Sequence, residues 1–428
     1  MPEAHLERTV GFWGTALLPV NGMIGAGIFA LPAIMVAAVG NFAPVMMLVG
    51  ALLILPLAFV FSTLATRFDQ HGGAVLYTHA AFGSFVGFQA GWSRYASGVV
   101  AVAANTQVAV SYLAVLFPVL DDPLIKTVAV IAFIAFTTVV NIVGMRLSVG
   151  TLAIMTAVKL VPLVGLIVIG LATHGPAVDF KLPAFTEVES VILLTFYAYM
   201  AFENATFPAG EVRNPRRAIP LAVMTTLGAV ALFYMLVISV YIAIAPDVGG
   251  NESALAAAAG KLVGQAGVVA ISIAAAFSIG ANILCGTIVT SRMTFGMAEQ
   301  GMLPRIFAHV SPRFHTPDVS ILFYGGAAIL FSLWAGFAAL AIASTLSRLV
   351  MYFLTSLALP VLQHRHAERA PWWHLPMAGV AAASTLWVAS HATVHAFQML
   401  GLILLVGTGL YFMTARRAPV SSATIETP

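Results

Sequence analysis

Long apolar stretches, separated by short polar segments, make up most of this 428-residue chain. A helix needs ~20 apolar residues to cross the ~30 Å of hydrocarbon in a bilayer. Backbone that faces lipid must satisfy its own hydrogen bonds, so the stretches are expected to be helices. The pattern predicts an all-α integral membrane protein of about 12 spans. We place these spans at about 10–36, 42–66, 84–116, 124–143, 148–172, 190–210, 217–245, 264–297, 317–336, 338–360, 374–391 and 395–415.

Composition supports the membrane assignment, since 60% of the residues are hydrophobic and only 8% are charged. An ordinary soluble domain carries about 25% charged residues. The spans use up the length, so residues 1–428 are expected to form a single domain. The one cysteine, Cys285, lies in an apolar run and offers neither a disulfide framework nor a cysteine metal cluster. Basic residues are spread over short loops, which argues against a nucleic-acid partner and leaves membrane lipid as the expected surrounding.

The distribution of lysine and arginine predicts an orientation. If the N-terminus is cytoplasmic and the spans alternate, most of the 19 basic residues fall on the cytoplasmic side. Both termini are then cytoplasmic and the protein lies in the cell (inner) membrane as a multi-pass protein. Eleven spans would move Arg416 and Arg417 to the other side and rank second. The polar tail 418–428 is expected to be disordered.

The first span contains Gly22, Gly25 and Gly27 near its middle. Each glycine costs about 1 kcal/mol relative to alanine inside a helix, so this segment unwinds easily. Unwound backbone at membrane depth is tolerated beside protein or a water-filled cavity, where its N–H groups can hold a carboxylate. The alternative is close helix packing through small residues.

The sixth span is the second irregular one. It carries Glu203 and Asn204 among apolar residues, followed by Pro208 and Gly210. A charge at this depth must face protein or water, so this span is also expected to be broken or to line a cavity. Spans one and six hold equivalent places in two five-span halves, which is typical of inverted-repeat transporters with a binding site at mid-membrane.

Four segments resemble the amino acid–polyamine–organocation (APC) transporter superfamily, of the bacterial amino-acid permease type. They are NGMIGAGIFALPA at 21–33, FDQHGGAVLYTHAAFG at 68–83, FYAYMAFENATFPAGEVRNPRRAIPLAV at 196–223 and SRMTFGMAEQGMLPRIFAHVSPRFHTPDVSI at 291–321. The resemblance implies a LeuT-like fold with a 5+5 inverted repeat and broken helices 1 and 6. The repeats would be 10–172 and 190–360, and residues 374–415 would form two accessory helices.

The resemblance also implies a substrate site. Ile24, Gly25, Ala26 and Gly27 match the family segment whose backbone receives the substrate carboxylate, with Met23 beside it. The matching helix-six segment offers carbonyls to the ammonium and side chains to the pocket; it comprises Tyr199, Met200, Ala201, Phe202 and Glu203.

Two positions depart from the family pattern. Ala201 stands where glycine is usual, which is expected to narrow the pocket. Gly210 stands where an acidic residue often precedes Glu211, which puts the cytoplasmic gate in doubt.

Lys159 lies within the fifth span. In one reading its ammonium snorkels to the headgroups. In the other, which the resemblance supports, it occupies the place where sodium-coupled members of this fold hold a cation and links helix five to the end of half-helix 1a. Burial favours a neutral amine, so the residue could also carry the coupling proton. We favour sodium independence and leave open whether Lys159 titrates.

Other polar residues within the spans are weaker candidates. Glu203 is better explained as part of the helix-six break than as a proton carrier. Arg94 and Arg348 are expected to pair with Glu203, with Glu211 or with a helix C-terminus, and not to bind substrate. Candidate cavity-lining residues of span eight are Ser278, Asn282 and Thr287.

The sequence therefore predicts a secondary transporter of amino acids, most readily neutral ones, that is proton-coupled or exchanging. A transporter or exporter of cationic amino acids or polyamines ranks next. A permease-like sensor without transport, and a membrane enzyme, are alternatives of other classes. No catalytic residue, cofactor or metal ligand is expected, and His391 and His395 are taken as part of a turn between the accessory spans.

Overall fold

The computed structural model describes residues 10–68, 72–144, 149–207, 209, 212–244, 253–365 and 370–415, which leaves Gly210, Glu211 and the tail 418–428 outside the described residues. Within this part of the chain the secondary structure is helical, apart from one parallel bridge between Val10 and Val212. The predicted all-α fold class is therefore confirmed.

The first half of the chain begins with two short helices in place of one continuous span. Its elements are α1 (Phe12–Met23), α2 (Ala26–Val39), η1 (Gly40–Phe42), α3 (Ala43–Ala65), α4 (Ala74–Phe82), α5 (Ser84–Leu116), η2 (Pro118–Asp121), α6 (Pro123–Val143) and α7 (Val149–His174).

The second half is interrupted near its start, where α8 gives way to a 3₁₀ turn. Its elements are α8 (Phe185–Tyr199), η3 (Phe202–Thr206), α9 (Pro215–Ile244), α10 (Ala254–Val263), α11 (Gln265–Glu299), η5 (Arg305–Ala308), α12 (Asp318–Ser332), α13 (Phe337–Arg365), α14 (His374–Ser390) and α15 (Val394–Ala415).

Nine segments of the described chain are long and apolar enough to cross a membrane, and one of them, Ala26–Ala65, joins α2 and α3. The helices α1, α12 and α14 have 12, 15 and 17 residues, which is short for a complete span. The dozen spans expected from the sequence therefore stays a prediction. The short helices α4 and α10 lie outside every predicted span.

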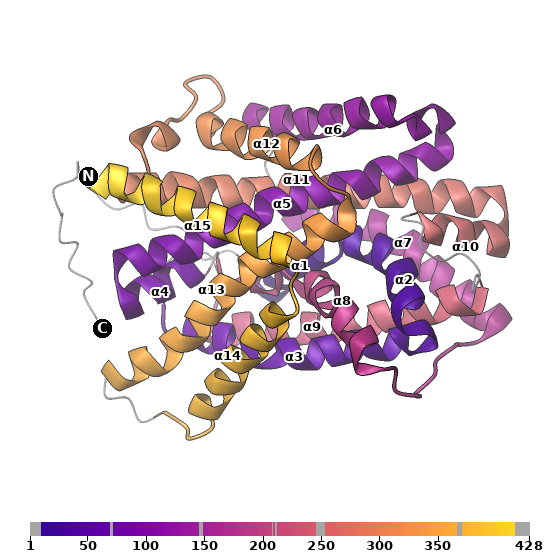
Figure 1. Ribbon diagram of the computed structural model, residues 1–428, viewed down its shortest axis with the longest axis horizontal. Coiled ribbons are helices and arrows are strands. Elements are labelled where there is room, and N and C mark those ends of the chain that lie inside the picture. The colour runs from indigo at the N-terminus through magenta and orange to yellow at the C-terminus, as the bar shows by residue number, and fades with distance from the viewer. Residues whose placement is uncertain are drawn as a thin grey trace.

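The longest helices form the frame of the molecule. Figure 1 shows α5 and α11 running along its long axis, and the two helices pack against each other, with α13 crossing α5. The helix α3 packs against α9, and α6 lies beside α12 at one edge. The two predicted accessory helices, α14 and α15, contact α13 from outside.

A few polar contacts fix the helices to one another. The indole of Trp92 in α5 donates to the carbonyl of Ile403 in α15 at 2.7 Å. Beside the bridge at the start of α1, the N–H of Arg213 donates to the carbonyl of Val10 at 2.8 Å. The start of α1 is thus attached to the residues that precede α9.

Candidate functional site

Two helix breaks lie against each other in the middle of the molecule. Between α1 and α2, Ile24 (φ −88°, ψ 79°) and Gly25 (φ −120°, ψ −136°) leave the helical conformation. Between α8 and η3, Met200 is extended and Ala201 is left-handed (φ 79°). A Cβ added at Gly22 would lie 2.6 Å from the Cβ of Ala201, so the two breaks touch. The predicted broken helices 1 and 6 are confirmed.

Carbonyl groups at the C-terminal end of α1 receive donors from α7 and α11. Lys159 Nζ donates to the carbonyls of Ile24 at 3.0 Å and Asn21 at 3.4 Å. Asn282 Nδ2 donates to Asn21 O at 2.8 Å and to Gly22 O at 2.9 Å, and Ser278 Oγ donates to Ile24 O at 3.3 Å. Helix carbonyls in the last turn have no partner within the helix, so these side chains stabilise the break.

The N-terminal end of α2 offers the opposite groups. Its first N–H groups have no partner within the helix, and Gly25 at the N-cap makes no side-chain capping bond. The helix dipole adds a partial positive charge at this end. The geometry therefore favours an anionic group beside Ala26 and Gly27.

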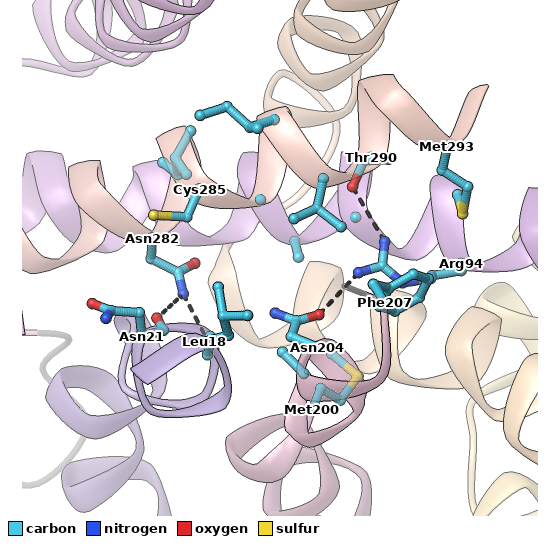
Figure 2. A pocket seen from close by; sticks show the side chains of 18 of the residues that line it. Leu18, Asn21, Arg94, Met200, Asn204, Phe207, Asn282, Cys285, Thr290 and Met293 are labelled. Carbon is cyan, nitrogen blue, oxygen red and sulfur yellow. Dashed lines mark hydrogen bonds between the residues drawn. The ribbon is translucent and has the colours of Figure 1, made fainter. Parts of the chain in front are cut away.

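A cavity of about 890 Å³ lies at the breaks, within the ~300–1,000 Å³ typical of small-molecule sites. Its walls come from α1, α2, α4, α5, α8, η3, α11, α12 and α13. In Figure 2, Asn282 and Arg94 lie on opposite sides of the pocket, and Asn204 and Met200 lie between them. Of the predicted site residues, the cavity is lined by Met23, Gly25, Ala26, Gly27, Met200, Ala201 and Asn282.

Seven of the predicted site residues do not line this cavity: Ile24, Tyr199, Phe202, Glu203, Lys159, Ser278 and Thr287. Ile24 is buried and accepts the bonds from α7 and α11 through its carbonyl. Tyr199 donates its hydroxyl to the carbonyl of Met47 at 2.7 Å, and Phe202 packs edge-to-face against Phe61. The carbonyl of Ile24 and the side chains of Tyr199 and Phe202 therefore stabilise the breaks from outside the cavity.

Glu203 is fully buried in η3 and lies behind the cavity wall. Its Oε1 accepts a hydrogen bond from Arg348 Nη1 at 3.0 Å and lies 3.9 Å from Arg94 Nε. Its Oε2 accepts a bond from the Tyr352 hydroxyl at 2.9 Å. Both intramembrane arginines thus meet Glu203, one of the two acidic partners that the sequence offered.

The remaining predicted residues take different places. Lys159 is fully buried and contacts the end of α1, as its second reading expected, but it does not line the cavity. Thr287 donates to the carbonyl of Ile283 in its own helix. His391 contacts Glu189 at 3.0 Å, which connects the turn after α14 to α8.

Asn105 was not anticipated from the sequence as a lining residue, and Asn204 was noted only as a polar residue of the sixth span. Asn105 donates to Asn282 Oδ1 at 3.1 Å and accepts from the Tyr197 hydroxyl at 2.6 Å, which joins α5, α8 and α11 around the cavity. Asn204 accepts a bond from Arg94 at 3.0 Å. Asparagine within a predicted span was the available signal, but only the fold brings these side chains to one cavity.

Within the described residues, no three His, Cys, Asp or Glu side chains form a metal-binding group. The cavity instead combines free N–H groups, amide side chains and apolar surface. Such an arrangement can bind and release a small polar solute through hydrogen bonds.

Comparisons with known proteins agree with this geometry. The family model described as "Amino acid permease" matches residues 10–413. The cadaverine/lysine antiporter of Escherichia coli K12 is 27% identical over 313 residues, covering 71% of this chain and 70% of the relative. The serine/threonine exchanger SteT of Bacillus subtilis is 27% identical over 438 residues, covering 96% and 98%. The chain belongs to the amino acid permease family, among the APC transporters.

Proposed function

We propose that this protein is a secondary transporter that moves amino acids across the cell (inner) membrane by alternating access. The observation that carries the proposal is the pair of touching helix breaks that open on one cavity. Each break leaves main-chain groups without a helical partner, N–H groups at the start of α2 and C=O groups at the end of α8. The dipoles of these groups can replace the water around the charged ends of an amino acid.

The backbone N–H groups of Ala26 and Gly27 bind the substrate carboxylate. The carbonyls of Tyr199 and Met200, at the C-terminal end of α8, bind its ammonium. Recognition by main-chain groups selects the amino-acid end common to all substrates, so the substrate side chain must be chosen by the other cavity walls.

The substrate carries no cationic side chain, and neutral amino acids are the first candidates. A second ammonium would need an acidic partner, and the described residues that line the cavity include three arginines and no carboxylate. The relatives do not decide the point, because one is named for cadaverine and lysine and the other for serine and threonine.

Transport is sodium-independent and either proton-coupled or exchanging. The ammonium of Lys159 lies against two carbonyls at the end of α1, as a bound cation would. A fixed positive charge there fills the place that a sodium ion would need. The repeats 10–172 and 190–360 would rock about this site, with both termini in the cytoplasm.

The purified protein in liposomes tests the proposal. Thermal-shift screening of amino acids and amines identifies ligands, and uptake of a labelled ligand is then measured with and without sodium and pH gradients. We expect uptake driven by a pH gradient or by amino acid inside the vesicle, and unaffected by sodium. Binding without uptake would favour a sensor, a strict sodium requirement would refute the role of Lys159, and no amino-acid ligand would refute the substrate class.

A further inference from the structure

Among the described residues, the positive charges that line the cavity outnumber the negative ones. Three arginines line it, and no described aspartate, glutamate or lysine does. Arg292 is exposed, whereas Arg94 in α5 and Arg348 in α13 are 3% and 5% exposed. A positive charge held in a buried site within a membrane is unfavourable unless an anion pairs with it.

Glu203 supplies one negative charge, and its carboxylate already accepts hydrogen bonds from Arg348 and Tyr352. The carboxylate oxygens accept bonds of 3.0 Å from Arg348 and 2.9 Å from Tyr352. Arg94 approaches the same carboxylate only through Nε, at 3.9 Å. Because the contact with Arg348 is the shorter one, the carboxylate of Glu203 mainly neutralises Arg348. The charge of Arg94 is therefore not fully neutralised.

Apart from Glu203 and Arg348, whose charges are opposite, the neighbours of Arg94 are neutral. Its guanidinium donates to Asn204 Oδ1 at 3.0 Å and to Thr290 Oγ1 at 3.3 Å, and it lies 4.5 Å from the centre of the Phe207 ring. Its Nε makes no hydrogen bond with any described residue. The guanidinium is thus held in place at the cavity wall, as Figure 2 shows, without a full counter-charge.

We propose that Arg94 forms an anion-binding subsite of the cavity, next to Thr290 and separate from the α2 end that receives the substrate carboxylate. The inference rests on the proposed amino-acid function and adds a second anionic group to it. That group is either a small inorganic anion bound beside a neutral amino acid, as the proposed function expects, or a carboxylate on the side chain of an acidic amino acid, in which case the substrate is acidic and not neutral. Arginine suits both because its planar fork donates several hydrogen bonds to an anion.

Binding measurements on the full chain in detergent separate the two sources. Thermal shift and titration calorimetry compare L-glutamate and L-aspartate with L-serine, L-leucine and L-lysine, each with chloride and with chloride replaced by a large organic sulfonate. The same panel is run on Arg94→Gln, which removes the charge, and on Arg94→Lys, which keeps it. Arg305→Gln, on an exposed turn away from the cavity, is the matched control.

For an acidic substrate, Arg94→Gln weakens glutamate or aspartate binding by about 30-fold or more, because a buried charge pair loses one partner. Arg94→Lys retains part of the affinity, the control retains all of it, and neutral amino acids bind Arg94→Gln as they bind the unmodified protein. For an inorganic anion, neutral amino acids need chloride, and that dependence disappears in Arg94→Gln. Both results support the subsite.

Other outcomes overturn the inference. Binding of neutral or cationic amino acids alone, independent of chloride, would show that no second anion is needed. An equal loss of neutral and acidic ligands in Arg94→Gln would place the α-carboxylate itself on Arg94. If no amino acid binds, the proposed function fails as well, which distinguishes that failure from failure of the subsite alone.

Discussion

Replacing Glu203 with glutamine tests the arrangement of charges behind the cavity. The carboxylate is fully buried and receives bonds from Arg348 and Tyr352 at 3.0 and 2.9 Å. The amide that replaces it is neutral and leaves two buried arginines without an acid. Breaking a buried ion pair by removing one partner costs about 3–5 kcal/mol, and we expect Glu203→Gln to lower the free energy of unfolding by this amount.

The double variant Glu203→Gln/Arg348→Gln removes both charges and recovers part of the loss, so the coupling between the two positions should reach about 2 kcal/mol. Unfolding in mixed micelles of increasing dodecyl sulfate content, followed by circular dichroism, measures all four proteins of the cycle. Glu299→Gln, at the exposed end of α11, is the control and should change little. A coupling energy below about 0.5 kcal/mol would refute the assignment of Glu203 to Arg348.

Three further predictions concern the helix breaks. Lys159→Met removes the charged donor from the carbonyls of Ile24 and Asn21, which keep only Ser278 and Asn282. Because hydrogen bonds from a charged group contribute about 1.5–3 kcal/mol, we expect a loss of this size in the same titration and a fall in uptake; an unchanged rate and pH profile would return the lysine to a passive role. Gly27→Ala would put a Cβ 2.7 Å from the hydroxyl of Tyr234, and we expect weaker substrate binding by thermal shift. Gly165→Ala meets no atom within 4 Å and should bind normally, and equal behaviour of the two variants would argue against the close fit. Ala201→Gly relieves a left-handed alanine (φ 79°) and should raise the unfolding free energy by about 1 kcal/mol, whereas a destabilised variant would show that the alanine side chain contributes packing that outweighs its backbone strain.

The sequence was sufficient for the broken helices because their signals are local. Three glycines within six residues indicated unwinding, and the structure places the break at Ile24 and Gly25. The charge of Glu203 within an apolar span indicated the second break in the same way. The limits of α5 and α11 also followed from hydropathy, since both helices are long and predominantly apolar despite a few polar residues within them.

Other features depend on how distant helices meet. Ile24 was expected at the pocket, yet its carbonyl accepts bonds from Lys159 and Ser278, and none of these three residues lines the cavity. The direction of a carbonyl in an unwound turn depends on φ and ψ, which no residue pattern determines. Ala201 was expected to narrow the pocket, and its left-handed backbone gives a further reason why glycine is usual there. The role of Asn105 likewise exists only because α8 and α11 present Tyr197 and Asn282 to it.

The bridge between Val10 and Val212 has a mechanical consequence. It attaches the beginning of α1 to the residues that precede α9, while the other end of α1 is bonded to α7 and α11. A tilt of α1 would therefore pull on three helices at once. The bridge must open if α1 moves without α9. While the bridge is closed, a force on Val10 is transmitted directly to α9 and not through the substrate cavity.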